Sequence, residues 1–273
     1  MNNKIIDLFC GCGGLSKGFE QAGFEVKIAI DMWEDAVITY NRNHKKPVAQ
    51  CHDIHTWDDK YLDEIKKESI VGIIGGPPCQ SWSEGGAKRG IDDPRGQLFH
   101  DYIRILKYVQ PLFFVAENVS GMLAPRNAKA VEEFLNEFRN AGMGYDVQLK
   151  MLNAKDYEVP EDRDRVFYIG FRKDLGIKDY CYPTPVSSRV TLREAIGDLQ
   201  NTAIPALEKN RSNGNACKVL NHEYYVGGFS SIFLSRNRVR SWDEVGFTVQ
   251  ASGRQCQLHP QAPKMIKINS NEQ

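Results

Sequence analysis

The sequence predicts an α/β fold: a doubly wound, mainly parallel sheet with a second, smaller, loop-rich domain. Short apolar runs alternate with amphipathic stretches over the first two thirds of the chain, and alternating β and α units imply a mainly parallel sheet with right-handed crossovers. The two prolines of Tyr182-Pro183-Thr184-Pro185 then mark a boundary. After Asp198 the chain becomes polar, with clusters of Asn, Gly and Ser. We therefore expect one domain over residues 1–183 and another over 184–273.

Each element of the first domain follows from its own apolar pattern. Ile70-Val71-Gly72-Ile73-Ile74 is a continuous apolar run with the length of a buried strand, and Gln97–Val109 carries apolar residues at helical spacing. Further apolar runs predict strands at Ile5–Phe9, Val26–Ile30, Leu112–Ala116, Tyr145–Leu152 and Arg165–Phe171. Amphipathic stretches between them predict helices at Leu15–Ala22, Ala36–Asn43 and Ala128–Ala141.

The composition is that of a soluble globular protein, with 273 residues, 41% hydrophobic and 26% charged, and a formal net charge of zero. No apolar run is long enough to cross a membrane, and the N-terminus does not resemble a signal peptide, so we expect a cytoplasmic protein. Zero net charge argues mildly against a protein wrapped in nucleic acid, although a local basic patch is compatible with it. Seven cysteines, an odd number, predict reduced thiols, and their spacing lacks the paired units of a zinc site.

A Gly-rich turn follows the first expected strand. Ile5–Phe9 runs into Cys10-Gly11-Cys12-Gly13-Gly14, and Val26–Ile30 ends at Asp31, where a carboxylate that binds ribose hydroxyls is usual. Asp53-Ile54 stands at a candidate third strand end. The turn alone could be only a tight turn. It lacks the full dinucleotide fingerprint and any phosphate-loop Lys, so a nucleoside cofactor without a polyphosphate fits better than NAD or ATP. S-adenosylmethionine is the natural candidate.

A second group of chemistry-bearing residues follows later strands. Cys79 comes directly after the stiff pair Pro77-Pro78 at the end of Ile70–Ile74. A lone cysteine of this kind is most often a buried apolar thiol. However, Glu117 ends another strand, and the carboxyl ends of parallel strands face one cleft. Arg163 and Arg165 precede a further strand, and the competing interpretation for them is a salt-bridged surface loop.

Together these groups can perform methyl transfer to a pyrimidine. A thiolate that attacks C6 turns C5 into a carbon nucleophile. A carboxyl group at N3 stabilises the resulting enamine, and arginine orients the base and the acid. C5 then takes the methyl group, and loss of the C5 proton with elimination of the thiol completes the turnover.

At these residues the chain resembles the DNA cytosine-C5 methyltransferases, most of all the HaeIII-type enzymes that methylate the inner cytosine of GGCC. The order and spacing of the matching segments agree with the family over nearly the whole chain. The segments are Asp7-Leu8-Phe9-Cys10-Gly11-Cys12-Gly13-Gly14, Gly76-Pro77-Pro78-Cys79-Gln80-Ser81-Trp82-Ser83, Glu117-Asn118-Val119 and Asp162-Arg163-Asp164-Arg165-Val166.

The resemblance implies roles for individual residues. Cys79 resembles the nucleophile, Glu117 the acid at N3, and Arg163 and Arg165 the supporting basic pair. The residues that match the S-adenosylmethionine pocket or its Gly-rich turn are Phe9, Gly11, Gly13, Asp31, Met32, Asp53, Ile54 and Pro77. Asp31 stands where many members carry Glu. Met32 replaces a more usual aromatic, so we expect weaker packing against adenine there.

The region Ser230–Gln257 is the expected DNA-reading segment. Its arginines can bind guanine edges or phosphates, and the candidates are Arg236, Arg238, Arg240 and Arg254. The competing interpretation is a solvated basic face. Thr248 lies in a Thr-Val pair that resembles the family's support for a flipped base. A target cytosine must leave the stack for a thiol to reach it, and the polar segment Ser81–Gly90 suits a loop that closes over the base.

One feature departs from the family. Past Gln273 the family continues with an Arg-Glu segment and a Gly-Asn-Ala/Ser-Val helix that closes the cofactor pocket. A shortened chain, an enzyme completed by a second chain, and a degenerate remnant remain open, the last being a DNA-binding fragment without activity. A transfer-RNA cytosine methyltransferase is a further alternative. The Arg-rich region favours double-stranded DNA as the partner, bound by a monomer, within a restriction–modification system.

Overall fold

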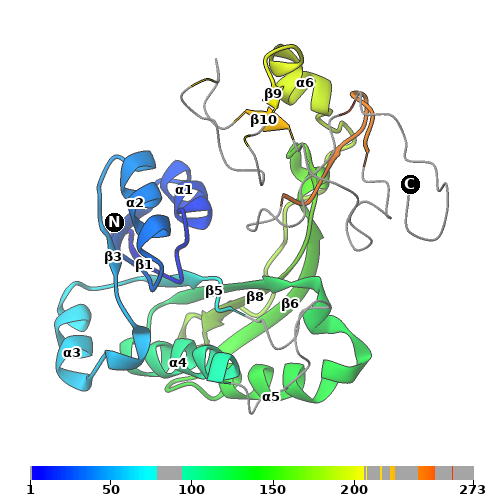
Figure 1. The fold of residues 1–273 in the computed structure, drawn as a ribbon. Coiled ribbons are helices and arrows are strands. Elements are labelled where there is room, and N and C mark those ends of the chain that lie inside the picture. Colours follow the sequence, from blue (N-terminus) through cyan, green and yellow to red (C-terminus); the bar gives the residue numbers. More distant parts are fainter. Residues whose placement is uncertain are drawn as a thin grey trace. The chain divides into compact units, whose positions relative to one another are not determined.

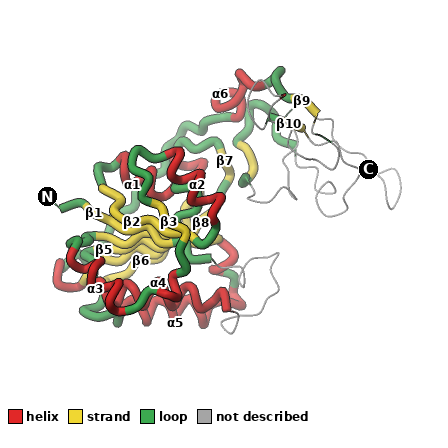
Figure 2. The backbone as a smooth tube through the Cα atoms, turned by 60° about the vertical axis from the view of Figure 1, so that its left-hand side comes forward, coloured by secondary structure: helices red, strands yellow, loops and turns green. Residues whose placement is uncertain are grey.

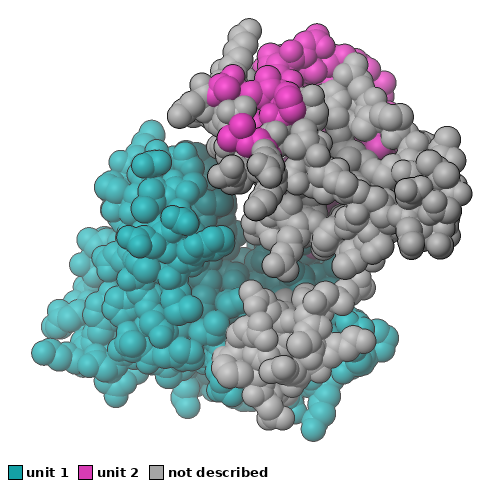
Figure 3. All heavy atoms as spheres, in the orientation of Figure 1, with its two compact units in different colours: residues 1–152, 165–182 teal, residues 153–164, 183–273 magenta. Residues whose placement is uncertain are grey.

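The structure is a computed structural model that describes residues 2–78, 94–205, 207, 216, 222–224, 239–249 and 260. The chain divides into two compact units, coloured separately in Figure 3. Unit 1 comprises residues 1–152 and 165–182, and unit 2 comprises residues 153–164 and 183–273. The catalytic and target-recognition roles expected for domains 1–183 and 184–273 stay predictions. The short segment 153–164, which the sequence pattern places in the first domain, groups with the second unit.

A seven-stranded sheet forms the centre of unit 1, in the order β3-β2-β1-β4-β5-β8-β6 (Figure 1). Neighbouring strands from β3 to β5 are parallel, and β8 runs antiparallel to β5. This mostly parallel, mixed sheet confirms the predicted fold class. The strands are β1 Lys4–Leu8, β2 Glu25–Asp31, β3 Ala49–Cys51, β4 Gly72–Gly75, β5 Phe113–Val119, β6 Tyr145–Asn153 and β8 Asp164–Arg172.

Helices cover both faces of this sheet (Figure 2). They are α1 Gly14–Gln21, α2 Glu34–Asn43, α3 Asp59–Lys67, α4 Pro94–Val109 and α5 Ala128–Arg139. Short 3₁₀ helices lie at η1 Ile54–Thr56, η3 Ser120–Leu123, η4 Pro125–Asn127, η5 Ala154–Tyr157, η6 Lys173–Leu175 and η7 Gly197–Leu199. No helix in the described part of the chain combines the length and the apolar character that a membrane span needs.

The two faces of the sheet have separate cores because successive strand residues point to opposite sides. Ile73 packs with Phe114 in the core under α3, α4 and α5. Ile74 packs with Val115 in the core under α1 and α2. Strands covered on both faces are apolar at consecutive positions, which is why the run 70–74 was recognisable in the sequence.

The expected strands and helices of unit 1 are present, with ends shifted by a few residues. β3 was expected only through a candidate strand end at Asp53-Ile54, just beyond its observed end at Cys51, and α3 was not anticipated. β3 has three residues, of which only Ala49 is buried. α3 buries only Leu62 and Ile65 on one narrow side, which is too short a stripe to stand out from its charged neighbours.

The described residues of unit 2 form short elements. Its described strands are β7 Glu161–Asp162, β9 Ile204–Pro205, β10 Glu223–Tyr224 and β11 Gly246–Phe247, and its described α-helix is α6 Leu192–Ile196. β11 pairs in parallel with β7, and β10 pairs with β9. A capping box between Thr191 and Glu194 begins α6 and satisfies its first backbone donors.

Candidate active site

The Gly-rich turn after β1 needs left-handed backbone. Phe9, Gly11 and Gly13 have φ of 62°, 53° and 90°, and Gly13 is the N-cap of α1. A Cβ on Gly13 would lie 2.1 Å from Nε2 of His44, so only glycine fits there. Apart from its two chain neighbours, no atom of the described residues would lie within 4 Å of a Cβ on Gly11. Gly11 therefore borders open space in which a ligand could approach the backbone.

Asp31, at the end of β2, is tied to this turn. Its two carboxylate oxygens accept the backbone N–H groups of Gly11 and Trp33, each at 2.9 Å. Each oxygen keeps a second lone pair that a hydroxyl group could use. The carboxylate is thus fixed at the carboxyl ends of β1 and β2, where ligands bind in open α/β sheets.

Apolar side chains and a third strand end lie next along the chain. Met32 and Trp33 are 72% and 61% exposed. Asp53 is the N-cap of η1 and accepts the His55 N–H at 3.0 Å, while Ile54 is buried. Carboxylates together with exposed apolar side chains suit a nucleoside better than a polyphosphate. The residues present therefore fit an adenosine-containing group such as S-adenosylmethionine.

Next to the turn, buried polar side chains from β1, α1 and α2 are joined by hydrogen bonds. The sequence pattern did not single out these residues. The Ser16 hydroxyl donates to Asp7 Oδ2 at 2.5 Å, and the Tyr40 hydroxyl donates to Ser16 at 3.0 Å. Burial raises the pKa of Asp7 to about 7. Burial also raises the pKa of the thiol of Cys10, the first residue of the turn, and so keeps this thiol protonated. The available signal in the sequence was an acid within the apolar run of β1, directly before the Gly-rich turn.

The segment that leads to Cys79 is anchored before it reaches that residue. Pro77 is buried, and its carbonyl accepts Nδ2 of Asn118 at 3.2 Å. Asn118 is 3% exposed, and its Oδ1 accepts the Val119 N–H at 2.8 Å. Asn118 therefore joins the end of β5 to the Pro-Pro turn. Cys79 itself lies outside the described residues.

Glu117 and Arg165 form the central ion pair of this end of the sheet. Arg165 Nε lies 2.8 Å from Glu117 Oε1, and the two side chains are 18% and 26% exposed. A Cβ on Gly76 would lie 3.3 Å from Glu117 Oε2, so the glycine keeps room beside the carboxylate. The predicted acid and one of the two predicted arginines are thus brought together within unit 1.

Arg163 lies in the segment 153–164 of unit 2. Its guanidinium NH1 is 3.4 Å from Glu161 Oε1, and its backbone N–H donates to Asn153 Oδ1 at 3.2 Å. The contact with Glu161 is of the kind expected for a salt-bridged surface loop, the competing interpretation of this arginine.

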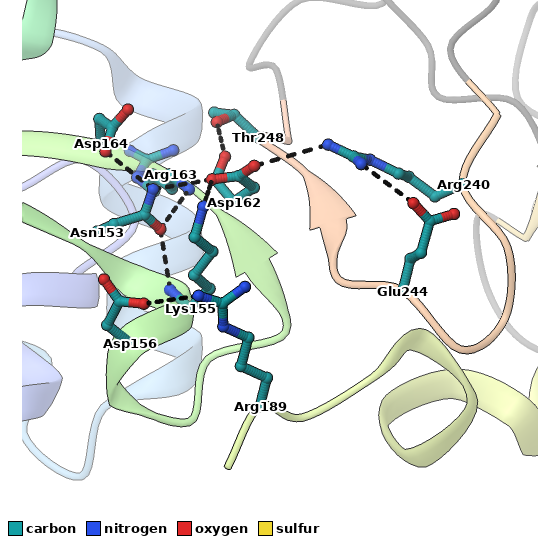
Figure 4. A network of polar contacts seen from close by, with 10 residues as sticks. All are labelled: Asn153, Lys155, Asp156, Asp162, Arg163, Asp164, Arg189, Arg240, Glu244 and Thr248. Carbon is teal, nitrogen blue, oxygen red and sulfur yellow. Dashed lines mark hydrogen bonds and ion pairs between the residues drawn. The ribbon is translucent and has the colours of Figure 1, made fainter. Parts of the chain in front are cut away.

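Two of the expected DNA-contacting residues lie in the described part of unit 2 (Figure 4). Arg240 NH1 and NH2 lie 3.2 Å from Glu244 and 3.6 Å from Asp162. The Thr248 hydroxyl donates to the backbone carbonyl of Asp162 at 2.7 Å. Asp162 had no assigned role in the sequence. The other candidates, Arg236, Arg238 and Arg254, lie outside the described residues.

Comparisons with known proteins agree with this arrangement. The family model described as C-5 cytosine-specific DNA methylase matches residues 3–273. The Type II methyltransferase M.NgoPII of Neisseria gonorrhoeae is 58% identical over 98% of this chain, which covers 77% of that protein. M.FnuDI of Fusobacterium nucleatum, also a Type II methyltransferase, is 54% identical over 98% of this chain and 76% of its own.

A solved structure is similar over the same length. It is described as a DNA modification methyltransferase encoded within an Escherichia coli prophage, and it matches with a TM-score of 0.70 at 26% identity, over 96% of this chain and 84% of its own. The fold, the strand-end residues and the sequence matches point the same way. The chain belongs to the C-5 cytosine-specific DNA methylase family and is an S-adenosylmethionine-dependent DNA cytosine-C5 methyltransferase of the restriction–modification type.

Proposed function

We propose that this chain methylates the inner cytosine of GGCC in double-stranded DNA, with the target base flipped out of the duplex and Cys79 as the nucleophile. The observation that carries the catalytic part is the Glu117–Arg165 pair at 2.8 Å, next to a Pro-Pro turn that Asn118 anchors. The GGCC site is supported by the resemblance of residues 235–240 and 250–263 to that group of enzymes.

The proposed chemistry uses the side chains in a fixed order. The Cys79 thiolate attacks C6, a C6–S bond forms, and the electrons of the C5–C6 double bond become available at C5. Glu117 shares a proton with N3 and so stabilises the enamine, while Arg165 holds the carboxyl group in place. S-adenosylmethionine, when bound, supplies an electrophilic methyl group for C5. Loss of the C5 proton restores the double bond, and the C6–S bond breaks to release the thiolate.

The cofactor would be held by the residues around the Gly-rich turn. Asp31 would accept ribose hydroxyls with its remaining lone pairs, and Gly11 would allow the ligand to pass close to the backbone. The full proposed set is Phe9, Gly11, Gly13, Asp31, Met32, Asp53, Ile54 and Pro77. Trp33 follows Met32 in the sequence and is 61% exposed. Its aromatic ring could pack against adenine in place of the aromatic residue that Met32 replaces.

For DNA, we propose that arginines of the segment 230–257 bind guanine edges and phosphates, with Arg236, Arg238 and Arg254 as the readers. Thr248 would support the gap left by the flipped base, and residues 81–90 would close over it. Arg163 would assist near the base. Arg240 belongs to the same segment but has partners inside the protein, Asp162 and Glu244.

The test is methyl transfer from labelled S-adenosylmethionine to a GGCC duplex. We expect label in this duplex, and none in one with a permuted site, in one with inner 5-methylcytosine, or in transfer RNA. Equal transfer to the permuted duplex would overturn the GGCC assignment, and transfer to transfer RNA alone would replace the substrate. Absence of transfer to every substrate would overturn the proposed activity of this chain.

The covalent step has its own test. A GGCC duplex with 5-fluorocytosine at the inner position cannot lose a proton from C5, so the Cys79–C6 bond persists once the methyl group is added. We expect a protein–DNA adduct by mass spectrometry with the wild-type chain and none with Cys79→Ser, which should still bind the duplex. An adduct with Cys79→Ser would remove Cys79 from its role. For base flipping, 2-aminopurine at the target position should gain fluorescence on binding, and unchanged fluorescence would contradict it.

A further inference from the structure

Arg240 is enclosed by three side chains of unit 2, which together with it we name the Arg240 clamp: Arg240, Asp162, Glu244 and Phe247. Glu244 Oε1 lies 3.2 Å from NH1, and Asp162 Oδ2 lies 3.6 Å from NH2. The guanidinium carbon lies 4.1 Å from the centre of the Phe247 ring. The Nε atom is buried without a hydrogen-bond partner among the described residues. Each terminal nitrogen of Arg240 therefore faces a carboxylate, and one face of the guanidinium packs on Phe247.

Asp162 has partners beyond Arg240 as well (Figure 4). Its Oδ1 accepts Lys155 Nζ at 2.7 Å and Asn153 Nδ2 at 2.8 Å, and the Lys155 bond lowers the pKa of this carboxyl. Its backbone carbonyl accepts the Thr248 hydroxyl at 2.7 Å, from a residue 86 positions away. A carboxylate with this set of donors stays ionised at neutral pH and can attract Arg240.

The clamp fastens two short segments to each other. β11 pairs with β7, so that Gly246 lies opposite Glu161 and Phe247 opposite Asp162. The Val249 N–H donates to Glu161 Oε1 at 2.9 Å. Because each strand has two residues, the pair forms few backbone hydrogen bonds, and its stability is marginal without other contacts. Of the three contacts of Arg240, the ion pair with Asp162 joins the two segments, whereas the contacts with Glu244 and Phe247 hold the guanidinium in place within its own segment.

We propose that Arg240 is a positioning residue, not a DNA reader: acting through Asp162, it sets the place of Thr248 relative to the segment that carries Arg163. This rests on the proposed function, in which Thr248 and Arg163 act at the flipped cytosine. An arginine reads guanine with two nitrogens of its planar fork, and in Arg240 these nitrogens face the carboxylates of Asp162 and Glu244. Bidentate contact of these two nitrogens with a guanine would therefore compete with both ion pairs.

The salt dependence of DNA binding separates the two roles. Each phosphate contact contributes about 0.9 to the slope of log K against log salt concentration. We expect Arg240→Gln to leave this slope for the GGCC duplex unchanged and to lower kcat/KM for it about tenfold, with KM for S-adenosylmethionine unchanged. Arg193→Gln is the matched control, because Arg193 forms an exposed ion pair with Asp243 in the same unit. It should match wild type in both measurements.

A double-mutant cycle tests whether Arg240 acts through Asp162. Asp162→Asn and Arg240→Gln should each lower kcat/KM about tenfold, and the double variant should also lose about tenfold, since groups that act as one unit are not additive. Additive losses of about a hundredfold would overturn the coupling. A slope reduced by about one in Arg240→Gln would overturn the positioning role and establish a phosphate contact.

Arg240→Lys keeps the proposal testable if Arg240→Gln does not fold. Lysine replaces arginine well as a point charge on phosphate but cannot bridge two carboxylates with a planar fork. The positioning role predicts reduced kcat/KM with an unchanged slope, and wild-type kcat/KM would contradict it. Wild-type transfer to GGCC is measured first. Absence of this transfer would overturn the proposed function. If transfer is present, then additive losses, a slope reduced by about one, or wild-type kcat/KM in Arg240→Lys would overturn only the role of Arg240.

Discussion

Arg165 lies diagonally across from Glu117 on the antiparallel pair β5 and β8, and their side chains meet at 2.8 Å. The register places Arg165 opposite Val119, two residues beyond Glu117. Diagonal neighbours on an antiparallel pair are within reach of long side chains. The antiparallel strand β8 therefore brings an arginine back to the strand end at which the acid stands.

The Glu117–Arg165 pair predicts a selective loss of chemistry on substitution. Glu117→Gln should lower the single-turnover rate of methyl transfer about 10²- to 10⁴-fold, since it removes the proton that we propose Glu117 shares with N3. Arg165→Lys should lower it less, because the charge remains but the planar fork is lost. Rapid-quench measurements at saturating DNA and S-adenosylmethionine report this rate.

Arg172→Lys is the control for that prediction. Arg172 ends the same strand β8 and pairs with Asp174 at 2.7 Å, away from Glu117. It should leave the single-turnover rate at the wild-type value. An Arg165→Lys variant that also turned over at the wild-type rate would show that the fork geometry is not needed.

Gly11 and Gly13 of the turn predict losses of folding stability that differ in size. Gly11→Ala adds a methyl group to open space, so the protein should fold with a loss of about 1–2 kcal/mol for left-handed backbone and lose affinity for S-adenosylmethionine. Gly13→Ala would drive Cβ into His44 and Tyr40 and should cost roughly 3 kcal/mol or more. Urea unfolding and calorimetric titration measure the two effects. Wild-type affinity in Gly11→Ala would place the ligand elsewhere.

Much of this arrangement could be predicted from the sequence because its signals are local. The run 70–74 is apolar at every position except Gly72, as a strand covered on both faces requires, and glycine with prolines marks its end. Glu117 could be placed at a strand end for the same reason. β3 and α3 bury too few side chains to produce a pattern.

The long-range partners of the site had no such signal. Asn118 bonds to Pro77 across 41 residues, and Thr248 bonds to Asp162 across 86. Neither bond produces a period in the sequence, because each depends on how strands are ordered in space. Arg240 looked like its neighbours Arg236 and Arg238 for the same reason: composition shows a basic segment but not which guanidinium groups already have partners within the protein.

The Asn118–Pro77 bond predicts that one buried amide controls the placement of the Cys79 segment. Asn118→Ala should destabilise the fold by about 1–3 kcal/mol and also lower the rate of adduct formation on a 5-fluorocytosine duplex. Asn127 is the matched control, since it is buried and its Nδ2 donates to the Gly121 carbonyl at 2.8 Å. Asn127→Ala should destabilise by a similar amount and leave the adduct rate unchanged. Equal adduct rates in the two variants would contradict an anchoring role for Asn118.

Asp7 predicts a pH dependence of stability. Burial raises its pKa from 3.8 to about 7 in the folded protein, so between these values the folded state holds a proton that the unfolded state has released. Stability must therefore fall as pH rises through this window, by about 4 kcal/mol at most from this group, since one pKa unit is worth about 1.4 kcal/mol. Asp7→Asn mimics the protonated acid, and its amide oxygen can still accept the Ser16 hydroxyl. Urea unfolding at pH 5 and pH 8 should show that the wild-type chain loses free energy of unfolding relative to Asp7→Asn as pH rises, and parallel pH profiles would show that Asp7 titrates normally.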